Sequence, residues 1–229
     1  MTRWLLLALL LAGCAAPPPP PPPPAPPVAV TVDDTAPGWY ATAAAAGKKI
    51  YKIDAAQSLV TVTVRRGGPM ARFGHDHVIA SRTLAGYVAP DAGRADFQFR
   101  LDQMTVDEAA LRTAAGLDTQ PSADAIQGTR DNMLGRVLEA ERYPLVLLQA
   151  ELLPNRGDTL KLTVTLHGVA RWYEVPTKIE RSKTGLTATG ELRMLQTDFG
   201  IKPMSVMAGA LTVQDQMELA FRIVATPLK

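Results

Sequence analysis

The stretch Thr159–Ile179, TLKLTVTLHGVARWYEVPTKI, decides the fold class of this chain. Leucine and valine alternate with polar side chains as far as Leu166, which is the period of a β-strand with one buried face. The alternation resumes after Gly168, with Tyr173 and Val175 on the apolar side. The stretch therefore predicts a hairpin of two antiparallel strands that turn one face toward a core.

Six further segments show the same alternation and complete the sheet. They are residues 58–64, 84–89, 95–101, 144–152, 186–195 and 214–225. Eight such strands bury their apolar face best by closing into an antiparallel β-barrel, because closure removes the sheet edges. A sandwich of two sheets is the alternative.

Two helices are predicted between the third and fourth strands. The first runs from Thr105 to Ala115, and Thr105 with Glu108 has the spacing of a capping box. The second runs from Ser122 to Ala140 and carries an apolar stripe at helical spacing, formed by Ile126, Met133, Leu134, Val137 and Leu138. This amphipathic helix is expected to cover the sheet.

The N-terminal residues have the composition of an export signal. Arg3 precedes an apolar run, Trp4–Ala12, that is too short to span a bilayer stably. Leu11–Cys14, LAGC, resembles the lipobox of bacterial lipoproteins, which implies cleavage before Cys14 and lipidation of that cysteine. An ordinary signal with a chance cysteine is the alternative. Because Ala15 is not aspartate, the resemblance favours anchoring in the outer membrane, with the protein on the periplasmic side of a bacterial cell envelope.

Composition and length fit one folded domain behind this leader. The chain has 229 residues, of which 47% are hydrophobic and 20% charged, enough for one sizeable core. The expected organisation is a signal peptide at 1–13, an acylated cysteine with a proline-rich spacer and linker at 14–49, and a barrel domain at 50–229. The proline run Pro17–Pro27 lacks backbone donors and is predicted to be a stiff spacer.

Charge and motifs exclude several classes of function. The net charge of +2 is small and no stripe of Lys and Arg follows the chain, so no nucleic-acid partner is expected. The sequence contains no G-x-S-x-G elbow, no H-E-x-x-H and no glycine-rich phosphate loop. A non-enzymatic protein without a cofactor is predicted.

Four motifs together resemble the YceI-like family. They are Tyr51–Asp54 leading to Ser58, Thr129–Leu134 with Tyr143-Pro144, Leu166–Arg171, and Thr197–Gly200, in the family's order and spacing. The resemblance covers nearly all of residues 50–226. It implies a lipocalin-like barrel that holds a polyisoprenoid chain in its interior.

Inward-facing apolar residues are the candidates for the lining of that interior. They are Val60, Val62, Val64, Phe97, Phe99, Val146, Leu148, Leu162, Val164, Tyr173, Leu192, Leu219 and Phe221. Small eight-stranded barrels often fill themselves with side chains, so an ordinary packed core is the alternative. The resemblance favours a cavity.

The histidines are the candidate polar groups. His75 and His77 form an H-x-H pair, which on an extended segment points both imidazoles to the same side. We expect the pair to hydrogen-bond a head group at the barrel mouth. The alternative is a metal site with His167 as a third ligand, although alternation places His167 on the polar face of its strand.

The expected function is that of a lipid-anchored carrier for an isoprenoid lipid, such as a quinone or polyprenyl chain. Helix 122–140 would cover the opening and move to admit the ligand. The rivals are a metal-binding protein or metal-dependent enzyme built on the histidines, and an interaction module with a filled interior. The sequence does not identify a protein partner.

Overall fold

The computed structural model describes residues 38–117 and 119–228. The predicted signal peptide, Cys14 and the proline run lie outside these residues. None of the helices within them has the length and apolar character needed to cross a bilayer.

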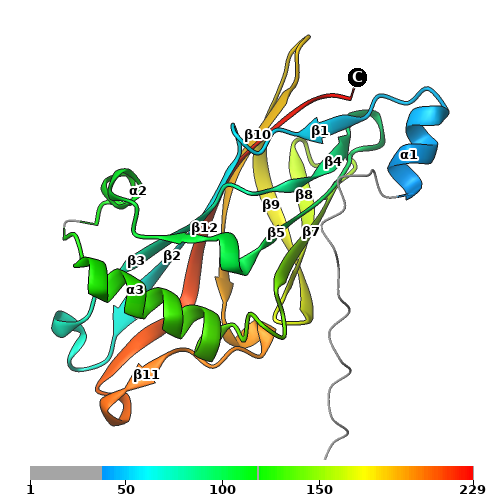
Figure 1. Cartoon of the computed structure of the whole chain (residues 1–229). Coiled ribbons are helices and arrows are strands. Elements are labelled where there is room, and N and C mark those ends of the chain that lie inside the picture. Colours follow the sequence, from blue (N-terminus) through cyan, green and yellow to red (C-terminus); the bar gives the residue numbers. More distant parts are fainter. Residues whose placement is uncertain (1–37, 118, 229) are drawn as a thin grey trace, which may run out of the picture.

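The described chain forms one antiparallel sheet that closes on itself (Figure 1). Its strands are β1 Tyr51–Ile53, β2 Leu59–Gly67, β3 His77–Ser81, β4 Ala85–Ala89, β5 Arg94–Arg100, β6 Thr105–Val106, β7 Leu145–Leu152, β8 Thr159–Leu166, β9 Val169–Arg181, β10 Leu186–Leu195, β11 Ser205–Val206 and β12 Leu211–Pro227. The order around the sheet is β1-β4-β5-β7-β8-β9-β10-β12-β2-β3-β6.

The barrel closes through the first and last strands of the described chain. β1 pairs with β4 on one side and with β12 on the other, where Tyr51 lies opposite Pro227. The long strand β12 then pairs with β2 as far as Thr212. With β1 and β2 counted as one strand and β3 and β4 as another, the barrel has eight strands, as the alternation predicted.

One central strand was missed by the sequence prediction. All five residues of β3 are buried, so the segment shows no alternation between apolar and polar residues. It pairs with β2 and, through Ile79 and Ala80, with β6. A strand buried on both faces cannot be recognised by a period of two.

The helices are α1 Gly38–Ala45, α2 Ala109–Ala114 and α3 Ala123–Asp131, and α3 continues as a π-helical segment, η4 Asn132–Val137. Single 3₁₀ turns are η1 Ala71–Phe73, η2 Pro90–Ala92, η3 Leu101–Gln103, η5 Thr197–Phe199 and η6 Met207–Gly209. Ser122 caps α3 by accepting the Ala125 backbone N–H at 3.2 Å. The apolar stripe predicted for this helix packs against the core.

The predicted start of the first helix was wrong. Thr105 and Val106 form β6, because they pair with β3, and the helix begins only at Ala109. The Thr105 hydroxyl does bond the Glu108 carboxylate, but as a side-chain contact and not as a cap on backbone N–H groups. A long-range strand pairing has overridden a local helix signal.

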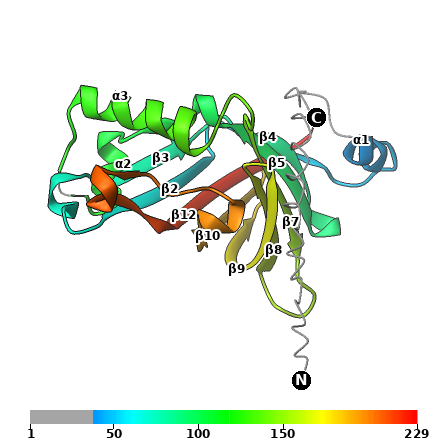
Figure 2. The ribbon, with the colours of Figure 1, turned by 90° about the horizontal axis from the view of Figure 1, so that it is seen from below.

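Helices α1 and α3 lie at opposite ends of the molecule (Figures 1 and 2). Helix α1 packs outside the barrel in a second apolar cluster with Ile50, Tyr87 and Ala89. Tyr40 is 1% exposed, and its hydroxyl donates to Asp96 Oδ2 at 2.7 Å. Burial and the Asp96 carboxylate raise the pKa of Tyr40. Residues 38–45, predicted to belong to a linker, therefore form a helix docked on the barrel.

Candidate ligand-binding site: two apolar cavities in the barrel

Two cavities lie in the barrel and share Leu148 and Leu219 as lining residues. The larger, here called the α3 cavity, has a volume of about 220 Å³ and is bordered by Met133, Val137 and Leu138. The smaller, here called the distal cavity, has a volume of about 80 Å³. The lining of both is predominantly apolar, so an apolar chain would bury its surface in either.

Eleven of the thirteen predicted lining residues border these cavities. Val62, Val64, Phe99, Val146 and Val164 line the α3 cavity, Val60, Phe97, Leu162 and Phe221 line the distal cavity, and Leu148 and Leu219 line both. They come from strands β2, β5, β7, β8 and β12. The period of two therefore placed these side chains on the correct face of the sheet.

Tyr173 and Leu192 line neither cavity and instead pack, partly buried, against the core. The pairing of β9 with β10 ends at Thr177 and Gly190, so both residues lie beyond the point where these strands separate. Phe199 of η5 is fully buried, and η5 contacts both strands. Burial raises the pKa of the Tyr173 hydroxyl, which has no hydrogen-bond partner among the described residues. Alternation predicted which face of the sheet Tyr173 and Leu192 occupy, but not the point at which β9 and β10 separate.

Four polar side chains line the α3 cavity: His77, Thr129, Asn132 and Gln196. His77 begins β3 and is 9% exposed. Thr129 and Asn132 face it from α3 and η4, and Thr129 Oγ1 lies 3.4 Å from His77 Nε2. His77 and Thr129 form the polar end of an otherwise apolar chamber.

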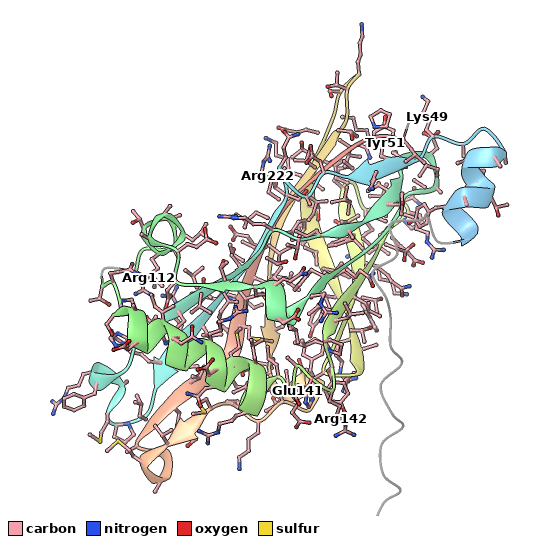
Figure 3. All side chains as sticks on the ribbon, viewed as in Figure 1. Lys49, Tyr51, Arg112, Glu141, Arg142 and Arg222 are labelled. Atoms are coloured by element: carbon pink, nitrogen blue, oxygen red, sulfur yellow. The ribbon has the colours of Figure 1, made fainter. Side chains whose placement is uncertain are left out.

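A buried ion pair holds His77 in place. Its Nδ1 lies 2.6 Å from Asp107 Oδ2, and Asp107 Oδ1 accepts from Arg112 Nη1 at 2.6 Å and from the Val78 backbone N–H at 3.0 Å. The side chain of Asp107 is fully buried and that of Arg112 is 2% exposed. Figure 3 shows Arg112, a residue of α2, between that helix and the start of α3. The sequence prediction missed this network, because His77 lies 30 residues before Asp107 along the chain.

The protonation state of Asp107 follows from these contacts. Burial alone would raise the pKa of its carboxyl, but hydrogen bonds from His77, Val78 and Arg112 outweigh burial and lower the pKa. Asp107 is therefore a carboxylate, and His77 Nδ1 must carry the proton that it donates to it. Asp107 adopts φ 57°, a left-handed backbone conformation that aspartate and asparagine tolerate better than most residues.

His75 does not share the position of His77. It is exposed, with its ring centroid 6.1 Å from that of His77, and it lines neither cavity. Asp76 between them faces away and accepts the Arg66 backbone N–H at 2.8 Å. Of the two predicted head-group candidates, only His77 reaches the cavity.

His167 is placed elsewhere, in the tight turn between β8 and β9, with φ 52°. Its Nδ1 lies 3.3 Å from the Phe199 carbonyl oxygen, its Nε2 lies 3.7 Å from Glu139 Oε1, and its ring packs on Tyr143. Alternation favours the polar face of the strand for His167 unless the chain turns at Gly168, and the structure has that turn, which redirects the side chain. Within residues 38–117 and 119–228 no three His, Cys, Asp or Glu side chains are grouped so that they could hold a metal ion. The structure thus does not unite His167 with His75 and His77.

Arg130 fastens α3 over the α3 cavity. Its guanidinium donates to the backbone carbonyls of Met104 and Asp102, in the segment between β5 and β6. Arg130, Thr129 and Asn132 all belong to the Thr129–Leu134 motif. That motif therefore supplies both an attachment of the helix and part of the polar end of the cavity.

Comparisons with known proteins agree with this architecture. The chain superimposes on a polyisoprenoid-binding domain from Saccharophagus degradans implicated in plant cell wall breakdown with a TM-score of 0.55 and 14% identity, over 78% of this chain and 98% of that one. It superimposes on Burkholderia cenocepacia BcnA with a TM-score of 0.51 and 16% identity, over 76% of this chain and 99% of that one. No curated protein matches the chain. The model of the YceI-like domain matches residues 51–225, and the chain therefore belongs to the YceI-like family.

Proposed function

We propose that this protein binds an isoprenoid lipid in its barrel and carries or sequesters it without chemical turnover. The observation that supports this most is the pair of apolar cavities that share Leu148 and Leu219 in their lining, with His77 and Thr129 as a polar pair in one of them. The similar domain from Saccharophagus degradans is described as polyisoprenoid-binding. A long apolar tail with one small head group has the same distribution of polarity as this interior.

The energetics favour such a ligand. Apolar surface removed from water contributes about 25 cal/mol per Å², so each added isoprene unit strengthens binding without needing a matched polar partner. The tail would extend from the α3 cavity into the distal cavity past Leu148 and Leu219. The head group would stay beside His77, the one histidine that lines a cavity.

We further propose that acylated Cys14 holds the protein at the periplasmic face of the outer membrane. The lipobox-like Leu11–Cys14 supports this. An anchor at the membrane would keep the barrel close to the bilayer that contains its ligand. The proline run would separate the two.

Native mass spectrometry tests the ligand directly. Residues 28–229 would be exported from a bacterial host, purified without detergent, and the bound mass extracted into organic solvent. A mass that extracts as a prenyl lipid is the expected result. A protein without bound lipid that also fails to take up added isoprenoids would contradict the proposal and favour an interaction module.

A further inference from the structure

The polar side chains of the α3 cavity include His77, whose cavity-facing nitrogen offers the ligand a hydrogen-bond acceptor. This inference rests on the proposed function and concerns the chemistry of the head group. Asn132 donates its amide to the Gly128 carbonyl at 2.8 Å. Gln196 donates its amide to the Gln214 carbonyl at 2.8 Å. Each amide keeps its second N–H and its carbonyl oxygen, and the carbonyl oxygen of Asn132 also accepts from Arg136 at 3.3 Å.

His77 also presents an acceptor. Its Nδ1 donates to the Asp107 carboxylate, whose negative charge Arg112 already balances. A neutral imidazole completes this buried network without adding an unpaired charge. Its Nε2 therefore faces Thr129 as an unprotonated nitrogen with a free lone pair.

Thr129 does not supply the missing proton. Its hydroxyl donates to the Ala125 carbonyl at 2.8 Å, the usual length of an O–H···O bond, whereas His77 Nε2 is 3.4 Å away. Two acceptor atoms thus face each other across a distance too long for a strong hydrogen bond. A hydroxyl group placed beside them would donate to Nε2.

The arginines that line the distal cavity are engaged with carboxylates. Arg94 Nε donates to Asp96 at 2.6 Å, and Arg181 Nη1 lies 4.0 Å from Asp158. A phosphate at that end would compete with these ion pairs, and a phosphate beside His77 would set its negative charge against the lone pair of Nε2.

We propose that the α3 cavity selects isoprenoids whose head group donates a hydrogen bond, namely a hydroxyl group, over ether, carbonyl or phosphate head groups on the same tail. His77 Nε2 is the principal acceptor, and Asp107 with Arg112 are positioning residues that fix its tautomer. The selection acts on the head group alone, because the tail contacts are identical.

Matched ligands test this selection on the full chain, freed of copurified lipid. Geranylgeraniol, its methyl ether and its monophosphate would each displace a fluorescent isoprenoid analogue. The ether should bind about tenfold more weakly than the alcohol, since it leaves the acceptors unpaired. Equal affinity for the alcohol and the ether would contradict the proposed selection of a hydroxyl head group, and the proposed function would still stand. If none of the three ligands binds, the proposed function itself fails.

Two variants test whether His77 is responsible for the selection between head groups. His77→Asn places an amide nitrogen near the position of Nδ1, so Asp107 keeps its donor while the cavity loses Nε2. This variant should bind alcohol and ether equally, whereas His75→Asn, at the exposed histidine, should keep the preference. Preference for the monophosphate, lost in Arg94→Ala or Arg181→Ala, would place the head group at the distal cavity and overturn the assignment.

If His77→Asn does not fold, a spectroscopic measurement on the wild-type chain tests the same proposal. In the wild-type chain with ¹⁵N-labelled histidine, Nδ1 of His77 should be protonated and Nε2 should give the resonance of a bare ring nitrogen. Geranylgeraniol should shift the Nε2 resonance toward that of a hydrogen-bonded nitrogen, and the ether should not. A protonated Nε2 in the free protein overturns the proposal.

Discussion

At the scale of single residues, Arg112 matters because it is a buried charge with one buried counterion. Replacing it by leucine leaves Asp107 without its ion-pair partner, and breaking a buried pair in this way costs about 3–5 kcal/mol. Urea unfolding of Arg112→Leu should show a loss of this size. The control is Arg82→Leu, which removes the half-exposed pair with Glu108 and should cost less than about 1 kcal/mol. Equal losses would mean that the pair is not desolvated.

The same network predicts how stability changes with pH. The folded-state pKa of Asp107 lies below its usual value of 3.8, so the carboxylate stabilises the fold above that pH and the contribution disappears as pH falls through the lowered pKa. Asp107→Asn keeps a residue that tolerates the left-handed backbone but cannot titrate. The free energy of unfolding measured from pH 6 down to about pH 2 should fall less steeply in Asp107→Asn than in the wild type. Parallel curves would show that Asp107 titrates alike in the folded and unfolded chain.

Val164 tests the cavity itself. It is 1% exposed and lines the α3 cavity, so Val164→Trp should fill that space and abolish isoprenoid uptake. Overpacking should cost about 1–3 kcal/mol, which is small enough to leave a folded protein. Thr163→Trp, on the opposite face of β8, adds the same ring outside the barrel and should leave uptake unchanged. Titration with a fluorescent isoprenoid analogue measures both variants.

At the scale of elements, α3 is the part of the structure best suited to open. It is attached by the Arg130 guanidinium, and it passes into a π-helical segment, a geometry in which backbone hydrogen bonding is less regular. Arg130→Met should speed the exchange of a bound fluorescent isoprenoid by about tenfold, because it removes charged hydrogen bonds that hold the closed position.

A matched change on the same helical stretch separates opening from general instability. Arg136 is exposed, and within the described chain its guanidinium hydrogen-bonds only Asn132. Arg136→Met should therefore leave the exchange rate unaltered. If the two variants exchange at the same rate as the wild type, α3 is not the gate.

The elements recoverable from the sequence were those exposed on one face. Strands such as β8 alternate and were predicted within a residue or two, whereas β3 is buried on both faces and gave no signal. Thr105 looked like a helix cap because the partner that makes it a strand residue, Ala80, lies far away along the chain. Local sequence patterns predict strands and helices that have one buried face. They miss elements whose structure depends on pairing with a distant part of the chain.

The candidate site divides in the same way. Its apolar lining follows from alternation, but its polar end depends on Asp107 and Arg112, which look like ordinary surface charges in the sequence. Only the burial created by packing turns them into positioning residues for His77. The Thr129–Leu134 motif and the H-x-H pair were the available signals: the motif identified the correct segment without giving its role, and the pair included His77.

At the scale of the whole molecule, α1 extends the folded unit before the first strand. Tyr40→Ala should release this helix by removing a fully buried ring, and trypsin should then cut after the exposed Lys48 or Lys49 at least about tenfold faster. Thr42→Ala, on the exposed side of the helix, is the control and should be cut at the wild-type rate. Rapid cleavage of the wild-type chain would show that α1 is not docked in solution.

The closure of the barrel by β1 and β12 has a consequence for how the protein folds. Tyr51–Ile53 pair with Ala225–Pro227, so one edge of β1 stays unpaired until residues more than 170 positions later in the sequence reach it. Pairings so distant in sequence form slowly, because the loop entropy must be lost before the contacts repay it. Until β12 joins β1, the barrel is therefore an open sheet whose unpaired edges can pair with other chains.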